Sequence, residues 1–176
     1  MRLKERPLVN QAEFSRLLEE LDGRPRSHAG LIVRFLAHTG LRINEARQVR
    51  WEHVREDFFL LPGNVTKNDR ARVIPFLNGI RETLKALQRV AGDQDLVIPQ
   101  TECKRSLRTA CRLTGLHRLT HHDFRHLFTT RCIESGVDIP TVARWRGDTD
   151  GGAMLVKTYF HLLDDHSRRM AERVKI

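Results

Sequence analysis

Apolar residues recur at helical spacing along most of the chain. Residues 10–21 begin with Asn10 three positions before Glu13, which is a capping-box pattern, and continue with a phenylalanine and three leucines on one face. Residues 27–40 are apolar on most sides and end at Gly40, where a left-handed helix cap is favourable. The two segments predict an amphipathic helix followed by a buried one.

Between residues 54 and 76 the helical spacing is replaced by short runs rich in β-branched and aromatic residues. Turn-forming proline, glycine, asparagine and aspartate separate the runs 54–61, 64–67 and 71–76. We expect a small three-stranded antiparallel sheet, with Lys67 beside the turn of its second hairpin.

Helical patterns fill the rest of the sequence. Further helices are predicted over residues 43–50, 79–90, 101–115, 121–131, 139–147, 151–163 and 166–174. Thr120 stands three residues before Asp123, so a second capping box sets the start of the helix in THHDFRHLFTTR. Because no repeat or low-complexity tract divides the chain, we expect one domain over residues 1–176. Its class is α+β, mainly α.

The charge balance indicates a polyanionic partner. Lys and Arg total 31 against 22 Asp and Glu, a formal net charge of +9, and nucleic acid fits this better than an anionic membrane surface. No run approaches the ~20 apolar residues of a membrane span, and the first ten residues lack a secretory pattern. We therefore expect a cytoplasmic protein with no membrane partner. Cys103, Cys111 and Cys132 show no C-x-x-C spacing and fit reduced core residues.

His122 and Arg125 are three residues apart at the start of one helix, so they share a face. Unpaired amides and the positive end of the helix dipole make that position an anion site, and phosphate is the obvious anion. The alternative is that Arg125 is a solvated surface cation and His122 a capping residue. His122 and His126 also have a metal-like spacing, but the H-E-x-x-H context and an obvious third ligand are missing, so no metal is expected.

Four segments carry the remaining chemistry. HTGLRINEA contains Arg42, VTKNDRARVIPF contains Lys67, HHDFRH contains His122 and Arg125, and WRGDTDGGAMLVKTYFHL contains Tyr159, the only tyrosine. In this order and spacing the sequence resembles the catalytic domain of the tyrosine recombinase, or phage integrase, family over nearly its whole length.

The resemblance implies metal-free cleavage and rejoining of DNA through a 3′-phosphotyrosine intermediate, with no cofactor. Arg42 and Arg125 would clamp the scissile phosphate, because fixed guanidiniums stabilise the charge that grows in the transition state. Tyr159 would attack, His122 would assist proton transfer, and Lys67 would protonate the leaving 5′ hydroxyl. The implied partners are double-stranded DNA and, on DNA, three further copies of the chain in a homo-tetramer, with a monomer when free.

The sequence departs from the family pattern at two positions near the tyrosine. Asp148 stands at the sixth catalytic position, where similar members have histidine, and Arg146 stands where they have leucine. An ionised carboxylate only accepts hydrogen bonds and repels phosphate. We expect weakened activity unless Asp148 is protonated or is paired with Arg144 or Arg146, and we expect Asp148→His to increase cleavage.

The family's amino-terminal DNA-clamping domain has no counterpart in the sequence, so weak site-specific affinity is expected. A catalytically degenerate module that binds DNA or regulates a recombinase is the main alternative, and a type IB topoisomerase-like enzyme is less favoured. The amphipathic tail, residues 162–176, could dock on a neighbouring copy or on its own domain.

Overall fold

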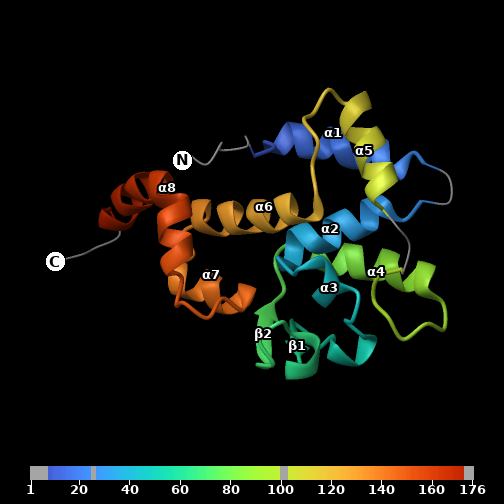
Figure 1. Cartoon of the computed structure of the whole chain (residues 1–176), viewed down its shortest axis with the longest axis horizontal. Helices are drawn as coiled ribbons and strands as arrows, with labels where there is room; N and C mark the ends of the chain where they lie inside the picture. The colour runs from blue at the N-terminus through green and yellow to red at the C-terminus, as the bar shows by residue number, and fades with distance from the viewer. Residues whose placement is uncertain (1–7, 25–26, 100–102, 173–176) are drawn as a thin grey trace.

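The computed structural model describes the backbone of residues 8–24, 27–99 and 103–172, and their side chains apart from 160–166 and 169. The elements are α1 (Gln11–Asp22), α2 (Ala29–Thr39), α3 (Ile43–Ala46), the 3₁₀ turn η1 (Trp51–His53), β1 (Phe58–Leu61), the 3₁₀ turn η2 (Gly63–Val65), β2 (Arg72–Pro75), α4 (Ile80–Ala91), α5 (Lys104–Leu113), α6 (His121–Glu134), α7 (Ile139–Arg146) and α8 (Ala153–Ala171). The predicted α+β class, mainly α, is confirmed (Figure 1).

Helix α2 lies at the centre of the fold and contacts α1, α4 and α6 (Figure 1). It ends at Gly40, whose φ of 62° is left-handed and whose amide donates to the carbonyl of Leu36. A Cβ atom at Gly40 would lie 2.4 Å from the ring of Phe128 on α6. Both the backbone angle and this close approach require glycine here. The approach brings the residues that follow α2 against α6.

The sheet has two strands, so the prediction of three is wrong in this detail. β1 and β2 pair antiparallel, with Phe58 opposite Pro75 and Leu61 opposite Arg72. The run 64–67, expected as the middle strand, belongs to η2 and to the loop that follows it.

Local contacts explain why this run is a closed loop. The Thr66 hydroxyl lies 2.9 Å from the carbonyl oxygen of Gly63 and accepts from the amide of Arg70 at 3.1 Å. A Cβ atom at Gly63 would lie 2.6 Å from the carbonyl oxygen of Asp69. The hydroxyl satisfies backbone groups that a third strand would have paired, and Lys67 lies on the loop between β1 and β2.

Helices α6, α7 and α8 enclose a second apolar cluster beside the main core. Its buried members are Phe128, Cys132, Ile133, Val142, Ala143, Leu155 and Tyr159. The predicted helices 151–163 and 166–174 form one helix, α8, which kinks at Tyr159 with φ −111° and ψ 20°. Residues 173 and 174 of that prediction lie outside the described residues, as do 101 and 102 of the predicted helix 101–115.

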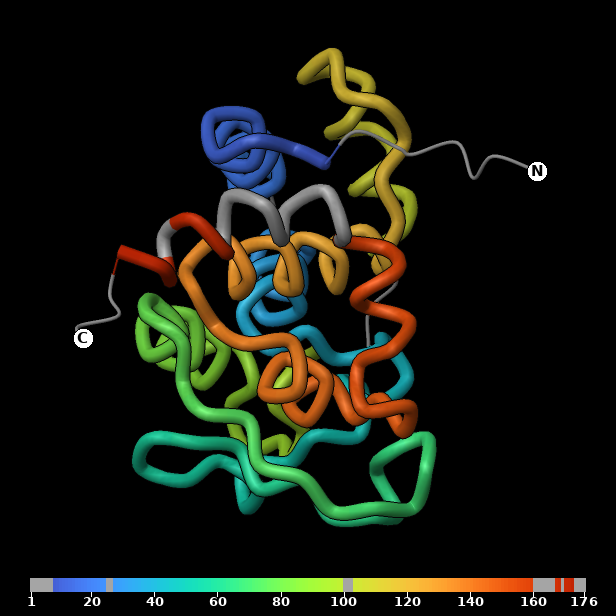
Figure 2. Tube along the Cα trace, turned by 90° about the vertical axis from the view of Figure 1, so that its left-hand side faces the viewer, coloured from blue at the N-terminus to red at the C-terminus, as the bar shows by residue number. Residues whose placement is uncertain are grey.

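The loop between β1 and β2 reaches the corner between α7 and α8 (Figure 2). The side-chain amide of Asn68 donates to the carbonyl of Gly147 at 3.0 Å, which fixes this contact. The end of α2, the loop, the second turn of α6 and the end of α7 therefore meet in one region. None of the helices in the described part of the chain is long and apolar enough to cross a membrane.

Candidate active site

Arg125 is the most deeply buried charged side chain of this region, with 2% of its surface exposed. Its guanidinium donates to the carbonyl of Gly40 at 2.6 Å, to the carbonyl of Arg146 at 3.1 and 3.2 Å, and to the carboxylate of Asp148 at 2.8 Å. Burial, followed by the charges of Arg146 and Arg42, lowers the pKa of Arg125 to about 9. The alternative of a solvated surface cation is therefore wrong, and Arg125 is still protonated at neutral pH.

Asp148 is the point on which three arginines converge. One carboxylate oxygen lies 2.8 Å from Nη2 of Arg125 and 3.7 Å from Nη2 of Arg42, and the other lies 3.0 Å from Nε of Arg146. Of the two arginines considered from the sequence as partners of Asp148, Arg146 pairs with the carboxylate, whereas Arg144 is exposed and donates to a threonine. A carboxylate held by guanidiniums marks a place where an oxyanion binds well.

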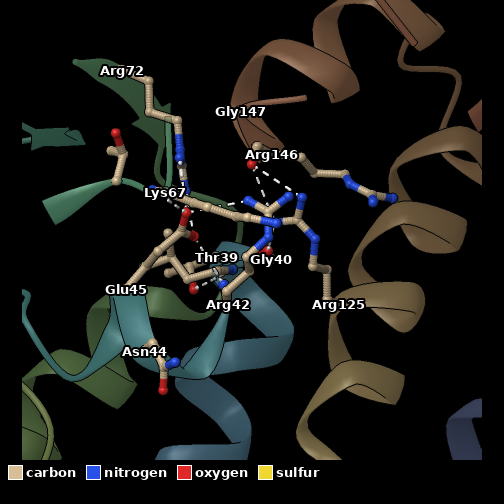
Figure 3. Close-up of polar contacts among 12 residues, drawn as sticks. Thr39, Gly40, Arg42, Asn44, Glu45, Lys67, Arg72, Arg125, Arg146 and Gly147 are labelled. Carbon is tan, nitrogen blue, oxygen red and sulfur yellow. Dashed lines mark hydrogen bonds and ion pairs between the residues drawn. The ribbon is translucent and has the colours of Figure 1, made fainter. Parts of the chain in front are cut away.

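Glu45 holds Arg42 in place and was missed by the sequence reasoning. This buried carboxylate lies 2.8 Å from Nη2 of Arg72 and 3.2 Å from Nη1 of Arg42, and it accepts from the backbone amides of Arg42 and Lys67 at 3.0 and 3.3 Å (Figure 3). Burial raises its pKa, but the hydrogen bonds and charge of Arg72 and the amide bonds outweigh burial, so the pKa is lowered. Glu45 stands three residues after Arg42 in the first turn of α3, a capping-box spacing that could have revealed it.

Lys67 joins this group through its backbone. Its amide binds Glu45, while its side chain is exposed on the loop. A cleft of about 250 Å³ lies between this loop and the end of α7, with Asn68, Arg70 and Asp148 among the residues that line it. A larger cavity of about 780 Å³ lies between α1, α2 and α4 and contains none of the six residues predicted from the sequence.

Tyr159 lies at the kink of α8 with 3% of its surface exposed. Its phenol oxygen is 2.6 Å from Nδ1 of His126. Burial raises the pKa of Tyr159, whereas the charge of Arg146 and hydrogen bonding with Thr129 and Arg146 act to lower it. The nucleophile candidate is thus in an apolar pocket with a histidine and an arginine at its polar end.

His126, rather than the predicted His122, contacts the phenol. Burial, followed by the charges of His122 and Arg146, lowers the pKa of His126 to about 4, so its imidazole is neutral at pH 7 and has one bare nitrogen. His122 is exposed, and its ring lies against His126 with 4.6 Å between centroids. Partial burial and the charges of Arg125 and Arg146 lower the pKa of His122 as well. The signal for His126 was the second histidine of HDFRH, considered above only for its metal-like spacing.

The contacts place the six predicted residues in two groups. Arg42, Arg125 and Asp148 meet directly, Lys67 is attached through Glu45, and His122 and Tyr159 are connected through His126. Within the described residues, no three histidine, cysteine, aspartate or glutamate side chains are arranged to hold a metal ion.

The chain is similar to known proteins in sequence and in fold. The family model described as "Phage integrase family" matches residues 8–166. The chain is 26% identical to tyrosine recombinase XerA of Thermococcus kodakarensis over 179 residues, which cover 96% of this chain and 62% of the relative. The chain thus spans less than two thirds of that relative's length.

Two solved structures show the same fold. The crystal structure of XerA recombinase matches with a TM-score of 0.74 and 21% identity, covering 99% of this chain and 68% of the other. The crystal structure of a lambda integrase tetramer bound to a Holliday junction matches with a TM-score of 0.68 and 17% identity, covering 84% of this chain and 48% of the other.

Proposed function

The chain belongs to the phage integrase family of tyrosine recombinases, and on that premise we propose that it cleaves and rejoins duplex DNA through a covalent bond between Tyr159 and a 3′ phosphate. One observation carries the proposal. The guanidiniums of Arg42, Arg125 and Arg146 converge on a single anion position beside the pocket of the only tyrosine. Such a site suits a phosphodiester attacked by a phenol.

The two clamp arginines would bind the non-bridging oxygens of the scissile phosphate. Arg125 is fixed by the carbonyls of Gly40 and Arg146, and Arg42 is fixed by Glu45. Because these donors are already oriented, they stabilise the pentacoordinate transition state without reorganisation. In the free protein the carboxylate of Asp148 occupies the anion position, so the incoming phosphate must displace it. This displacement is the physical reason to expect weakened activity.

Residues of this chain can accept and supply every proton that the cleavage step moves. The phenol proton of Tyr159 passes to Nδ1 of His126, and the phenolate oxygen forms a bond to phosphorus while the bond from phosphorus to the 5′ oxygen breaks. Lys67 supplies the proton that the leaving 5′ oxygen takes up. The reverse sequence rejoins the strands, and the phosphotyrosine bond conserves the energy for that step.

Double-stranded DNA is the substrate that fits the net charge of +9. We further propose that four copies assemble on DNA, as in the tetramer of lambda integrase on a Holliday junction, that the free protein is a monomer, and that it acts in the cytoplasm. The chain covers 62% of its XerA relative, and we propose that residues 1–176 form one catalytic domain.

A catalytically degenerate module that binds DNA without cutting it is the second candidate. The observation that favours it is the carboxylate of Asp148 inside the clamp, where it competes with phosphate. The two candidates agree on DNA binding and differ on whether Tyr159 becomes covalently attached.

The deciding experiment uses duplexes selected by this protein from a random-sequence pool and then nicked, so that the cut end diffuses away. The proposal predicts a protein-DNA adduct that survives denaturant and is absent in Tyr159→Phe, and whose rate of formation falls by about 100-fold or more in Arg125→Lys. Arg144→Lys, which conserves charge at an exposed arginine of α7, should behave as wild type. Tight binding of the selected duplex without adduct at any pH would instead support the DNA-binding module.

A further inference from the structure

Arg146 is a buried arginine at the end of α7, and its two ends touch different parts of the site. Its side chain is 11% exposed, and Nη1 donates to the hydroxyl of Thr129 at 2.7 Å while Nε lies 3.0 Å from Asp148. Its backbone carbonyl accepts both Nη groups of Arg125. In Figure 3 the side chain extends past Arg125, on the side away from Arg42.

The side to which Arg146 extends is the tyrosine pocket. The charge of Arg146 acts to lower the pKa of the Tyr159 phenol, and Thr129, which accepts a hydrogen bond from Arg146, acts on that pKa in the same direction. The guanidinium therefore acts on both the anion position marked by Asp148 and the oxygen that would attack. Arg125 contacts Asp148 too, but its charge acts on the phenol less strongly than that of Arg146.

Packing alone does not explain a charged residue at this position. Arg146 adjoins the apolar cluster of Val142, Ala143 and Tyr159, and its Nε has no hydrogen bond of proper geometry despite being buried. A buried ion pair can often be replaced by apolar residues without loss of stability. A partly satisfied guanidinium that faces a phenol and a carboxylate is better explained by the charge it places there.

We propose that Arg146 couples the nucleophile to the phosphate clamp: its guanidinium stabilises the phenolate of Tyr159 as the proton leaves for His126, and Asp148 positions that guanidinium until the substrate phosphate takes its place. The inference rests on the proposed function and adds a residue to it. Arg146 then supplies the hydrogen-bond donor that Asp148, as a carboxylate, does not. The unusual residues at 146 and 148 thus act as a pair.

The single tyrosine allows a direct test without DNA. Replacing tyrosine by a fluorotyrosine that ionises near neutral pH gives one ¹⁹F NMR signal, and its pH titration reports the pKa of residue 159 alone. We expect Arg146→Leu to raise that pKa by about one unit or more, a tenfold change in the ionisation equilibrium. Arg146→Lys should retain much of the effect, and Asp148→Asn should lower the pKa because it removes the anion that offsets Arg146.

The matched control is Arg144→Leu, which removes the same charge from an exposed position of the same helix. Its titration should coincide with wild type. If Arg146→Leu titrates like Arg144→Leu while circular dichroism shows both folded, the inference is overturned; if Arg146→Leu does not fold, Arg146→Gln decides by the same comparison.

A second readout follows adduct formation with the selected nicked duplex as a function of pH. Arg146→Leu should shift the pH of half-maximal rate upward by the same amount as the phenol pKa, with much of the rate recovered at high pH. A uniform loss at every pH would indicate a structural role and contradict the inference. If no variant, wild type included, forms adduct, the proposed function fails, while the fluorine titration still decides the inference about Arg146.

Discussion

Replacing Asp148 by asparagine should destabilise the free protein and make its stability depend on phosphate. The substitution removes the one carboxylate shared by Arg42, Arg125 and Arg146. Removing one partner of a buried pair costs about 3–5 kcal/mol. Because 15% of the Asp148 side chain and 32% of the Arg42 side chain are exposed, screening reduces this, and we expect about 2–3 kcal/mol.

In a chain of this size each 1 kcal/mol shifts the melting temperature by about 2–4 °C, so the variant should melt about 4–12 °C lower. Inorganic phosphate should reverse the loss, because it fills the anion position that the carboxylate has left. A ligand present at 100 times its Kd adds about 2.7 kcal/mol. In the wild type Asp148 competes for the same place, so phosphate should stabilise it less.

The assay is urea unfolding with increasing phosphate, set against chloride at equal ionic strength so that screening is the same in both series. Asp69→Asn is the matched control, since it makes the same charge change at an exposed loop residue whose positive φ of 51° suits asparagine. An Asp148→Asn protein as stable as Asp69→Asn, or one that gains no more from phosphate than wild type, would refute the idea that the carboxylate fills a phosphate position.

Three further predictions concern the supports of the site. Gly40→Ala should lower the free energy of unfolding by about 2–4 kcal/mol, because it adds a clash with Phe128 to the strain of a positive φ. Gly115→Ala is the control: its φ is +71° but the space around it is open, so it should lose only the stability that corresponds to the backbone strain. Equal losses of stability in urea unfolding would contradict this. Glu45→Gln should destabilise the protein at pH 7 by about 2–4 kcal/mol, because it removes the buried carboxylate that Arg42 and Arg72 share. Since the folded pKa of Glu45 is lowered, this difference should shrink as the pH falls below the usual glutamate range, and a pH-independent difference would count against it. The pKa of His126 is about 4 in the folded protein, against about 6.5 for an unperturbed histidine. The unfolded chain therefore binds more protons between these values, and stability should fall as the pH drops from 6.5 to 4. The stability of His126→Gln should fall less over the same range, and equal falls would argue against a neutral, buried imidazole.

Local patterns predicted much of the fold. The capping boxes at Asn10 and Thr120 are present: Glu13 and Asp123 accept from the N-cap amides at 2.8 and 2.6 Å. The left-handed cap at Gly40 is present as well. These features depend on residues within one turn of each other, so their sequence signals are complete in themselves.

Features that depend on distant contacts were missed. The run 64–67 has strand-like residues, but the Thr66 hydroxyl closes a loop that α7 then holds through Asn68. The kink of α8 at Tyr159 leaves no mark in the apolar spacing of that helix.

The site residues show the same difference between local signals, which the sequence reveals, and distant contacts, which it does not. The motif order brought Arg42, Arg125 and Tyr159 into consideration, because the resemblance fixes them by position. The contacts and burial that tune these residues come from tertiary packing. His126 contacts the phenol of Tyr159 because α8 packs against α6. Arg125 is buried because α2 ends against α6. Sequence spacing therefore identified candidate chemistry better than it identified the partners that tune it.

The central claim is that the phenol of Tyr159 becomes joined to DNA phosphorus. Mass spectrometry of the nuclease-digested and protease-digested adduct from the selected nicked duplex tests it most directly. The account predicts a nucleotide attached through its 3′ phosphate to the peptide that contains Tyr159, with a free 5′ hydroxyl on the released strand. A nucleotide found on any other residue, or a 5′ phosphate on the released strand, would contradict it.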